Sequence, residues 1–401
     1  MRPFGALISY KEATDIIDAH VQPIKRTETV PLDYAVNRVL AEDLVAAMNV
    51  PPFNRAAMDG YAVKAKDTFG AGQFKPAICK VIGEIHAGEN PEKKIKTGQC
   101  IQISTGAVMP EGADSVIMVE DTEREGNEVK IFKSITPGSN IGKIGGDIKE
   151  GAVVLKAGIL LDAAKMGVLA SQGLSKVKVY EKPKIAILPT GEEVIAAGKK
   201  LKPGQLYDIN SHTISALVQT SGGTPVKIGI AGDNLEELRS AMKESLKSDM
   251  VVLSGGSSVG ERDLLVDVID MWGEILFHGV QVKPGKPTIF AMLEGKPLMG
   301  MPGYPTSCLI NSYLFLIPAI RKMARLPSRK GDTVKAKLSR RVPGSTGRRQ
   351  FLTVKLVGDE AVSVFKESGA ITSIAEADGY IEIPENIDLL EKGDIVTVTL
   401  F

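Results

Sequence analysis

Residues 251–263 read VVLSGGSSVGERD, and they decide how the middle of the chain folds. An apolar run that breaks into glycines and serines is typical of a buried strand ending in a loop. Glycines in such a loop let backbone N–H groups approach phosphate oxygens. This loop, however, carries Glu261 and Asp263, whose carboxylates repel phosphate, and it lacks the lysine of the usual phosphate loop. The loop is therefore a candidate ligand site whose charge needs its own explanation.

Strand, loop and helix alternate on both sides of this stretch, from Lys184 to about Ile320. This alternation predicts a doubly wound, largely parallel sheet with helices on both faces. One helix is expected to begin with a capping box, because Glu236 follows Asp233 by three residues. The expected strands are KIAILPTG, PVKIGIAGD, MVVLSGG, EILFHGVQ, TIFAML and PLMGMPG, and the expected helices are SHTISALVQTSGG, DNLEELRSAMKESLKS, LLVDVIDMW and SCLINSYLFLIPAI.

The flanking regions follow different patterns. Ser9 and Glu12 predict a capped helix that ends at about Val21. From Met48 to about Val154, short apolar or alternating runs between Gly and Pro turns favour β-rich modules, and LLDAAKMGVLASQG closes this half as a short helix. The last segment, from Thr333 to Phe401, returns to short strands and predicts a small β-barrel or sandwich. The fold class is thus multidomain α/β plus β, with N-terminal mixed β-rich modules, a central doubly wound α/β domain and a C-terminal small β-barrel.

Composition limits the kind of protein. A chain of 401 residues with a net charge of +1 has no broad field to attract nucleic acid or anionic lipid. No apolar run reaches the ~18 residues that span a bilayer, and MRPFGALISYKE has too short an apolar core for a signal peptide. Three widely spaced cysteines indicate neither a disulfide framework nor a zinc site. We expect a cytoplasmic protein with no nucleic-acid or membrane partner.

Polar loops follow several of the expected strands. Because the carboxyl ends of parallel strands meet at one edge of a sheet, these loops are expected together at the edge where open α/β sheets bind ligands. If the ligand arrives with a divalent cation, the acidic side chains become oxygen ligands for magnesium. The loops are residues 189–193, 232–234, 254–263 and 301–305, and the acids are Asp233, Glu261 and Asp263. Lys283 and Lys286 in the KPGKP segment could bind an anion.

Each of these features also has a purely structural explanation. A glycine-rich loop is more often only a tight turn, and Asp233 is a good helix N-cap. Lys283 and Lys286 could simply be solvated surface charges. Asp59 before Gly60 could be an ordinary pair of turn residues. The convergence of several polar loops on one edge favours a ligand site over independent accidents.

Eight motifs occur in order along the chain: PPFNRAAMDGYAV, ISTGAVMPEGADSVIMVED, GGDIKEG, LPTGEEV, GQLYDINS, SGGSSVGERD, KPGKP and MPGYPTSC. In this order they resemble the molybdopterin molybdenumtransferase (MoeA) family, to which the E domain of gephyrin also belongs. The resemblance covers essentially the whole chain and implies a homodimer. It implies an N-terminal region at 1–180 made of two intertwined modules (about 1–45 with 140–180, and about 46–139), an α/β molybdopterin-binding domain at 181–327 and a β-barrel at 328–401.

The activity implied by the resemblance is the insertion of molybdate into adenylylated molybdopterin with release of AMP, which gives molybdenum cofactor. Mg²⁺ is the implied cofactor, and a molybdopterin adenylyltransferase is the implied upstream partner. Two alternatives stay open at this point: a molybdopterin adenylyltransferase, whose domain the α/β region also resembles, and a non-catalytic pterin-binding scaffold. Molybdate and tungstate have the same charge and almost the same size, so the residues do not separate them.

The resemblance also implies roles for single residues. The implied catalytic residues are Asp59, Glu193, Asp233 and Asp263, and the implied metal ligands are Asp233, Glu261 and Asp263. The residues implied to bind pterin, adenylate or oxyanion are Thr105, Asp147, Gly255, Gly256, Ser258, Lys283, Lys286, Pro302, Gly303, Ser307, Arg349 and Ser368. In the implied dimer, Asp59 and its N-terminal neighbours face the α/β site of the partner. Tyr304 departs from the pattern, since many family members have Asn there.

Overall fold

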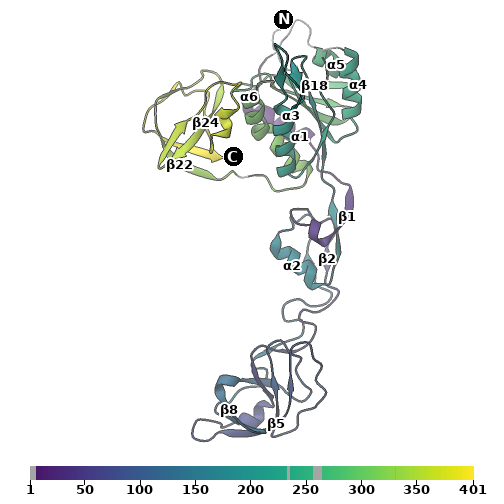
Figure 1. Cartoon of the computed structure of the whole chain (residues 1–401), viewed down its shortest axis with the longest axis vertical. Coiled ribbons are helices and arrows are strands. Elements are labelled where there is room, and N and C mark those ends of the chain that lie inside the picture. The colour runs from purple at the N-terminus through teal and green to yellow at the C-terminus, as the bar shows by residue number, and fades with distance from the viewer. Residues whose placement is uncertain (1–5, 233–234, 256–263, 330) are drawn as a thin grey trace. The chain divides into compact units, whose positions relative to one another are not determined.

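The computed structural model describes residues 6–232, 235–255, 264–329 and 331–401. It divides into two compact units (Figure 1). Unit 1 comprises residues 1–28, 37–39 and 179–401, and unit 2 comprises residues 29–36 and 40–178. The chain passes between the units through β1 (Thr27–Pro31) and β12 (Lys176–Tyr180), which pair as a two-stranded ribbon.

A six-stranded sheet in the order β16-β13-β17-β21-β20-β18 forms the centre of unit 1. Its strands are β13 (Lys184–Pro189), β16 (Thr224–Lys227), β17 (Met250–Ser254), β18 (Gly273–His278), β20 (Ile289–Leu293) and β21 (Lys296–Met301). The first four strands in this order are parallel, whereas β20 runs antiparallel to both of its neighbours, β21 and β18. The turn at Glu294 and Gly295, both with positive φ, joins β20 to β21 and allows only an antiparallel pair. The predicted doubly wound sheet is confirmed, with an antiparallel end that the alternation did not predict.

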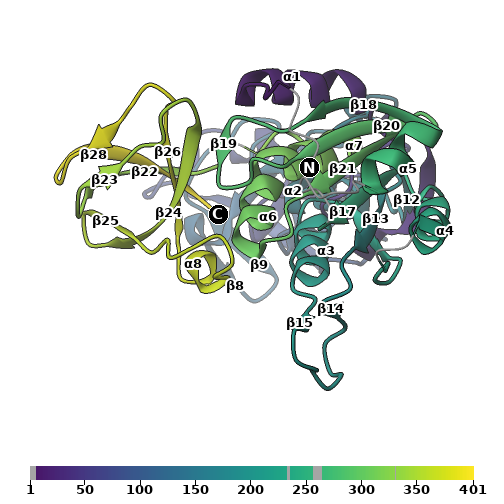
Figure 2. The same cartoon turned by 90° about the horizontal axis from the view of Figure 1, so that it is seen from above.

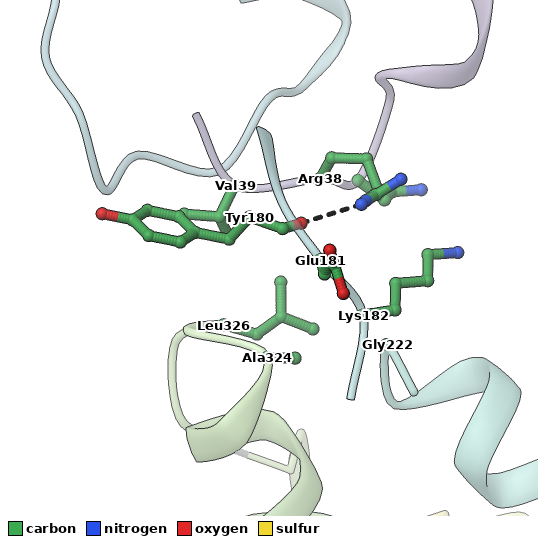
Figure 3. A pocket seen from close by; sticks show the side chains of 9 residues that line it. Arg38, Val39, Tyr180, Glu181, Lys182, Gly222, Ala324 and Leu326 are labelled. Atoms are coloured by element: carbon green, nitrogen blue, oxygen red, sulfur yellow. Dashed lines mark hydrogen bonds between the residues drawn. The ribbon is translucent and has the colours of Figure 1, made fainter. Parts of the chain in front are cut away.

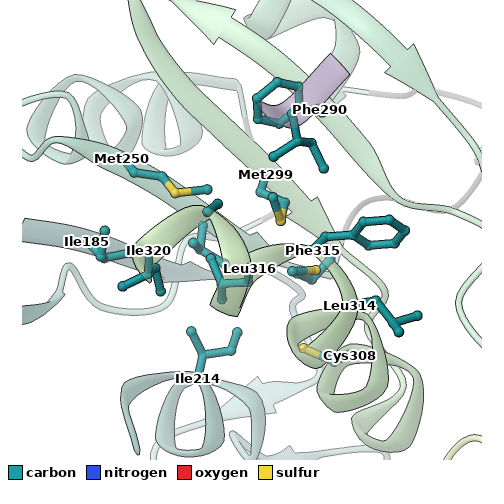
Figure 4. Packing of buried hydrophobic residues seen from close by; sticks show 14 of the residues in the cluster. Ile185, Ile214, Met250, Phe290, Met299, Cys308, Leu314, Phe315, Leu316 and Ile320 are labelled. Atoms are coloured by element: carbon teal, nitrogen blue, oxygen red, sulfur yellow. The ribbon is translucent and has the colours of Figure 1, made fainter. Parts of the chain in front are cut away.

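Helices cover both faces of this sheet, and the packing follows from the alternation of side chains along each strand (Figure 2). In β13, Ile185 and Ile187 join one core, while Ala186 and Leu188 join the other. Each fully buried aliphatic side chain of this kind stabilises the fold by about 1.5–3 kcal/mol. The first core, shown in Figure 4, lies under α1 (Tyr10–His20), α3 (Asn210–Thr220), α6 (Pro305–Asn311) and α7 (Ile317–Met323), and the second under α4 (Leu235–Ser245) and α5 (Leu264–Trp272).

Helix α1 begins with the predicted capping box. The Glu12 carboxylate accepts from the Ser9 N–H at 2.8 Å, and the Ser9 hydroxyl accepts from the Glu12 N–H at 3.2 Å. Its apolar face, with Ala13 and Ile17, packs into the first core of the α/β sheet. The first helix of the chain, which was expected in the N-terminal region, is therefore part of unit 1.

Five strands close into a barrel at the C-terminal end of unit 1. The order β24-β25-β22-β28-β26 returns to β24, which selects the barrel over the sandwich. The strands are β22 (Thr333–Leu338), β24 (Arg349–Val357), β25 (Glu360–Ser363), β26 (Gly379–Ile383) and β28 (Ile395–Leu400), with β23 (Val342–Pro343), β27 (Leu389–Leu390) and α8 (Thr372–Ala375) in the connections. A short strand of the α/β region, β19 (Val282–Lys283), pairs in parallel with β24.

Unit 2 contains the expected β-rich part. Its main sheet has the order β7-β4-β6-β5-β9-β8, with antiparallel pairs apart from the parallel pair of β5 and β6. The strands are β4 (Gly60–Val63), β5 (Ala77–Ile85), β6 (Gln99–Ile103), β7 (Ser115–Met118), β8 (Thr122–Glu125) and β9 (Glu128–Ile131). The smaller elements are β2 (Leu44–Val45) with β11 (Val153–Leu155), β3 (Arg55–Ala56) with β10 (Ile141–Gly142), and α2 (Ala163–Ser171). All three cysteines of the chain are buried and form no disulfide.

Candidate active site

Three loops meet at the carboxyl edge of the parallel strands. Thr190 donates its N–H to the Ser254 carbonyl at 3.0 Å, and Gly255 donates its N–H to the Met301 carbonyl at 3.3 Å. Gly255 has a φ of +97°, and a Cβ there would lie 2.5 Å from the Thr190 carbonyl oxygen. Only glycine fits this position, because any side chain would push the first two loops apart. The expected gathering of the loops after β13, β17 and β21 is therefore observed.

The KPGKP turn reaches the same edge from the carboxyl end of β18. Because β20 runs antiparallel to β21, its first residue, Ile289, lies opposite Gly300 near the carboxyl end of β21. His278, the last residue of β18, lies opposite Ile289, so the segment from β18 to β20 that contains the turn lies at this edge. The Lys286 carbonyl accepts from the N–H groups of Val280 and Thr288, both at 2.9 Å. The side chains of Lys283 and Lys286 are half-buried.

Helix α6 follows the PGYP turn and carries Ser307. Pro305 stands in the first turn of the helix, where its missing N–H leaves no hydrogen bond unmade. The Gly303 carbonyl accepts from the Asn210 side chain at 2.8 Å, so the turn is tied to the start of α3. Ser307 is only 3% exposed, and Pro302 is buried at the base of the turn.

Two barrel segments approach this helix. The Ser368 carbonyl accepts from the Thr306 N–H at 3.1 Å, and the Ala370 carbonyl accepts from the Thr306 hydroxyl at 2.8 Å. A Cβ on Gly369 would touch the ring of Tyr304 at 3.8 Å. Ser368 therefore lies beside the residue that precedes Ser307, which brings these two expected site residues into one neighbourhood.

Arg349 comes to the site through the pairing of its backbone with Val282 in β19. Its guanidinium, however, is held by two carboxylates, at 2.9 Å from Glu382 and 3.0 Å from Glu385, and it lies 5.5 Å from the Tyr10 ring centre. The hydrogen bond that Arg349 donates to the Glu385 carboxylate raises the pKa of Arg349 above its ordinary value. By contrast, within the described part of the chain Arg348 forms no ion pair. The charge of Arg349 is already compensated, whereas that of Arg348 is not.

Three buried oxygen atoms at the edge have no hydrogen-bond partner among the described residues. They are Thr190 Oγ1, Asn210 Oδ1 and Ser254 Oγ, on residues that are 8%, 8% and 3% exposed. Buried polar groups are nearly always satisfied, so an unsatisfied group needs an explanation. Sequence patterns did not single out these three residues as site residues, although Ser254 directly follows the apolar run Val251–Leu253.

Two of the expected N-terminal site residues lie together in unit 2. Asp59 Oδ1 accepts from the Thr105 N–H at 2.7 Å and from the Thr105 hydroxyl at 3.0 Å. Asp147 is exposed, and its N–H donates to the Val50 carbonyl at 3.0 Å. Glu193, in unit 1, folds its carboxylate back over Gly191, on the arm of β14 (Val194–Ile195) and β15 (Leu206–Tyr207) that projects beyond α3 in Figure 2.

The remaining expected residues lie outside the described part of the chain: Asp233, Gly256, Ser258, Glu261 and Asp263. Among the residues that are described, no group of three or more His, Cys, Asp or Glu side chains is arranged to hold a metal ion.

Comparisons with known proteins agree along the chain. Three family models match in order: "MoeA N-terminal region (domain I and II)" at residues 8–173, "Probable molybdopterin binding domain" at 186–322 and "MoeA C-terminal region (domain IV)" at 335–401. The molybdopterin molybdenumtransferase of Staphylococcus epidermidis is 34% identical, over 98% of this chain and 95% of its own length. The chain belongs to the MoeA family.

Other relatives agree with this membership. The molybdopterin molybdenumtransferase of Bacillus subtilis is 32% identical over 95% of this chain and 91% of its own length. A crystal structure of a molybdopterin biosynthesis MoeA protein from Pyrococcus horikoshii superposes with a TM-score of 0.86, at 42% identity, and covers 98% of this chain and 99% of the other. The resemblance of the eight motifs to the MoeA family is thereby confirmed.

A cavity in unit 1, away from the sheet edge, is too small to bind a substrate. Figure 3 shows Arg38 donating to the Tyr180 carbonyl, at 2.8 Å, beside Gly222 and Leu326. The cavity volume is about 10 Å³. That is close to the minimum for one water molecule, so the cavity cannot hold a substrate.

No helix of the described residues is both long enough and apolar enough to cross a membrane.

The contact between Asp59 and Thr105 predicts a measurable shift in acidity. The Thr105 N–H and hydroxyl both stabilise the carboxylate, and they hold the pKa of Asp59 below its ordinary value. Because the pKa is lower in the folded protein, this stabilisation is present above the ordinary pKa of aspartate and is lost as the pH falls. Thr105→Val removes only the hydroxyl donor, so the pKa of Asp59 should rise part of the way towards its ordinary value.

An NMR titration of ¹³C-labelled aspartate carboxyl groups measures this change. Ser104→Ala is the matched control, because the Ser104 hydroxyl contacts His86 and makes no bond to Asp59. A pKa that is the same in wild type and in Thr105→Val would show that the hydroxyl contributes nothing.

Proposed function

We propose that this protein is a molybdopterin molybdenumtransferase, which inserts molybdate into adenylylated molybdopterin and releases AMP. Near full-length relatives carry this name. The observation that carries the proposal is the convergence on one sheet edge of a lysine-bearing turn, the PGYP turn with Ser307, and a barrel segment with Ser368. Supplying the protein with adenylylated molybdopterin, with and without molybdate, tests this proposal. With molybdate present, the protein should release AMP and leave the metal on the pterin.

The residues at the edge suit a tetrahedral dianion. Lys283 and Lys286 place two positive charges on one turn, and charged donors form shorter and stronger hydrogen bonds to an anion than neutral donors do. The Ser307 hydroxyl and nearby backbone N–H groups supply further donors. Such a site needs no protein nucleophile, because holding molybdate beside the pterin dithiolene sulfurs is itself most of the catalysis. Metal analysis of the released cofactor distinguishes molybdate from tungstate as the oxyanion.

The unsatisfied oxygens of Thr190, Asn210 and Ser254 support a polar ligand at the same edge. A pterin carries ring N–H and amino groups that are hydrogen-bond donors, and all three oxygens can accept. An apolar ligand would leave them unsatisfied, at a cost of about 1–3 kcal/mol each.

We propose Mg²⁺ as the cofactor because the loops at this edge carry carboxylates that could bind it. Asp233, Glu261 and Asp263 would supply the carboxylate oxygens that Mg²⁺ prefers. When bound, the ion would neutralise negative charge on the phosphate groups of the adenylylated pterin.

A homodimer is proposed from the family and from the surface of unit 2. Val45 and Val153 lie opposite each other in the β2–β11 pair, and they are 52% and 51% exposed. Phe53, Met58 and Ile144 are further exposed apolar side chains of unit 2. We propose that a second copy of the chain covers the exposed pair of Val45 and Val153, since contiguous exposed apolar side chains can mark a surface that another protein buries.

The proposed compartment and upstream partner follow from chemistry. Three buried, free cysteines fit a reducing compartment, and we place the protein in the cytoplasm. An adenylylated substrate requires an enzyme that adenylylates the pterin, so a molybdopterin adenylyltransferase is the proposed upstream partner.

Lys286→Ala tests the oxyanion site. The molybdate concentration for half-maximal AMP release should rise on the order of 10- to 100-fold, from the ~1.5–3 kcal/mol of a hydrogen bond to a charged group. The half-saturating concentration of adenylylated pterin should stay the same. Lys247→Ala is the control, since that lysine pairs with Glu244 on the surface of α4. An unchanged molybdate dependence, or an equal loss for both substrates, would remove Lys286 from the oxyanion site.

The two neighbouring arginines give a second test. The family resemblance assigns Arg349 to the oxyanion, but its guanidinium already pairs with Glu382 and Glu385. Arg348→Ala is therefore expected to raise the half-saturating molybdate concentration more than Arg349→Ala does. Arg349→Ala should instead lower the midpoint of thermal unfolding, because it leaves two carboxylates without their partner. The reverse result would return Arg349 to the oxyanion site.

Subunit mixing tests the proposed dimer. If N-terminal residues of one subunit complete the site of the other, Asp59→Ala and Asp263→Ala subunits are each inactive alone but complement each other. An equal mixture should recover about a quarter of wild-type AMP release, since half of the dimers are mixed and each has one intact site. Mass spectrometry of the intact complex confirms the exchange of subunits. Exchange without recovery would place both residues in the same site of one subunit.

A further inference from the structure

One buried polar side chain near the lysine turn has no role in the chemistry proposed above. Asn311 is the last residue of α6, is 0% exposed, and directly precedes a π-helical turn at Ser312–Leu316. Its amide donates to the Gly285 carbonyl at 2.8 Å and to the Thr288 hydroxyl oxygen at 2.5 Å. Asn311 thus reaches from the helix to the centre of the KPGKP turn.

The direction of these hydrogen bonds is fixed. The Thr288 hydroxyl donates its only hydrogen to the Gly285 carbonyl at 2.9 Å, so towards Asn311 it can only accept. The Gly285 carbonyl can likewise only accept. Both hydrogens of the Asn311 amide are therefore used, and rotating the amide by half a turn would set its oxygen against two acceptors. Asn311 Oδ1 has no partner among the described residues, and it is kept buried although this costs stability.

The turn and the side chain also fit each other sterically. Gly285 has a φ of +101°, and a Cβ there would lie 2.3 Å from Asn311 Nδ2 and 2.5 Å from Oδ1. The turn can take this path only because residue 285 lacks a side chain. A displaced Asn311 would leave the turn without its contact on that side.

Helix α6 connects this contact to the other parts of the edge. Ser307 lies one helical turn before Asn311, so the two residues share a face of the helix. The N–H of Thr306, next to Ser307, donates to the Ser368 carbonyl. One helix therefore fixes the serine hydroxyl, the barrel segment and, through Asn311, the turn that carries Lys283 and Lys286.

We propose that Asn311 is a positioning residue for oxyanion binding. It holds the backbone of the lysine turn so that Lys283 and Lys286 keep their distance from Ser307. This inference rests on the proposed function only for the identity of the oxyanion, because the contact itself is independent of the reaction. Asn311 does not touch the anion, and its effect is transmitted through Gly285.

Asn311→Asp is the sharpest test, because the side chain keeps its size but loses both donors to the turn. Equilibrium dialysis with radioactive molybdate measures oxyanion binding without any reaction. The dissociation constant for molybdate should rise on the order of tenfold, since a displacement of about 1 Å in a positioning contact can cost up to ~100-fold. Adenylylated pterin should bind as tightly as it does to wild type.

Thr288→Val is the second variant, because it removes one of the two acceptors without adding charge, and it should weaken molybdate binding by a smaller factor. Ser312→Ala is the matched control: this neighbouring side chain is equally buried but donates to Cys308 within its own helix. It should bind molybdate like wild type even if it unfolds at a lower temperature. If the three variants instead shared a folding defect, the binding of molybdate and the binding of adenylylated pterin would weaken equally, which would contradict the positioning role.

The results separate the two proposals. Molybdate binding by wild type without AMP release would contradict the proposed function and leave the Asn311 comparison intact. Wild-type molybdate affinity in both Asn311→Asp and Thr288→Val, or no molybdate binding by wild type, would overturn the positioning role.

Discussion

The register of β20 against β21 is the constraint on which the rest of the site depends. Ile289 lies opposite Gly300, and a Cβ on Gly300 would come within 3.1 Å of the Ile289 Cβ, so the close approach of the two strands favours glycine at position 300. A slip of one residue would turn every side chain of β20 to the other core. The same register sets where the turn before β20 lies, and it brings Lys283 and Lys286 to the carboxyl edge of strands that run the opposite way.

The position of the barrel follows from the same segment. Its β24 pairs with only the two residues of β19, which is too little to fix a domain by itself. An aromatic cluster supplies the remaining contact: the Tyr10 ring lies 5.5 Å from that of Phe351 in the barrel and 5.7 Å from that of Phe315 beneath the sheet. Burial raises the pKa of Tyr10 to about 12, as expected for a phenol in apolar surroundings. This apolar packing and the two hydrogen bonds of Thr306 together hold the Ser368 segment beside Ser307.

The sequence predicted the elements whose signals are local. A capping box needs only Ser9 and Glu12, and a buried strand followed by a glycine loop is visible in residues 251–263. Neither required knowledge of the rest of the chain. The eight ordered motifs added the family, because several short patterns in a fixed order are far more specific than any one of them.

What the sequence could not predict depends on contacts between distant residues. The partners of Arg349 follow it by 33 and 36 positions, and Asn311 bonds to a turn 26 residues earlier. No spacing rule for a helix or a strand connects such pairs. The antiparallel direction of β20 is likewise set by the turn at Glu294 and Gly295, whose positive φ values are visible only in the structure.

Most of the buried polar atoms without partners in the described residues gather at the sheet edge. Of the five such buried side-chain atoms in the described residues, three line the sheet edge, one belongs to Asn311 behind the lysine turn, and one is in the barrel. Each costs the unliganded protein about 1–3 kcal/mol where nothing satisfies it. Apolar replacements at Thr190 or Ser254 would be more stable and could not bind a polar ring. The three oxygens at the edge that the lysine turn also reaches therefore favour a ligand that is both anionic and rich in hydrogen-bond donors, and binding it should stabilise the fold.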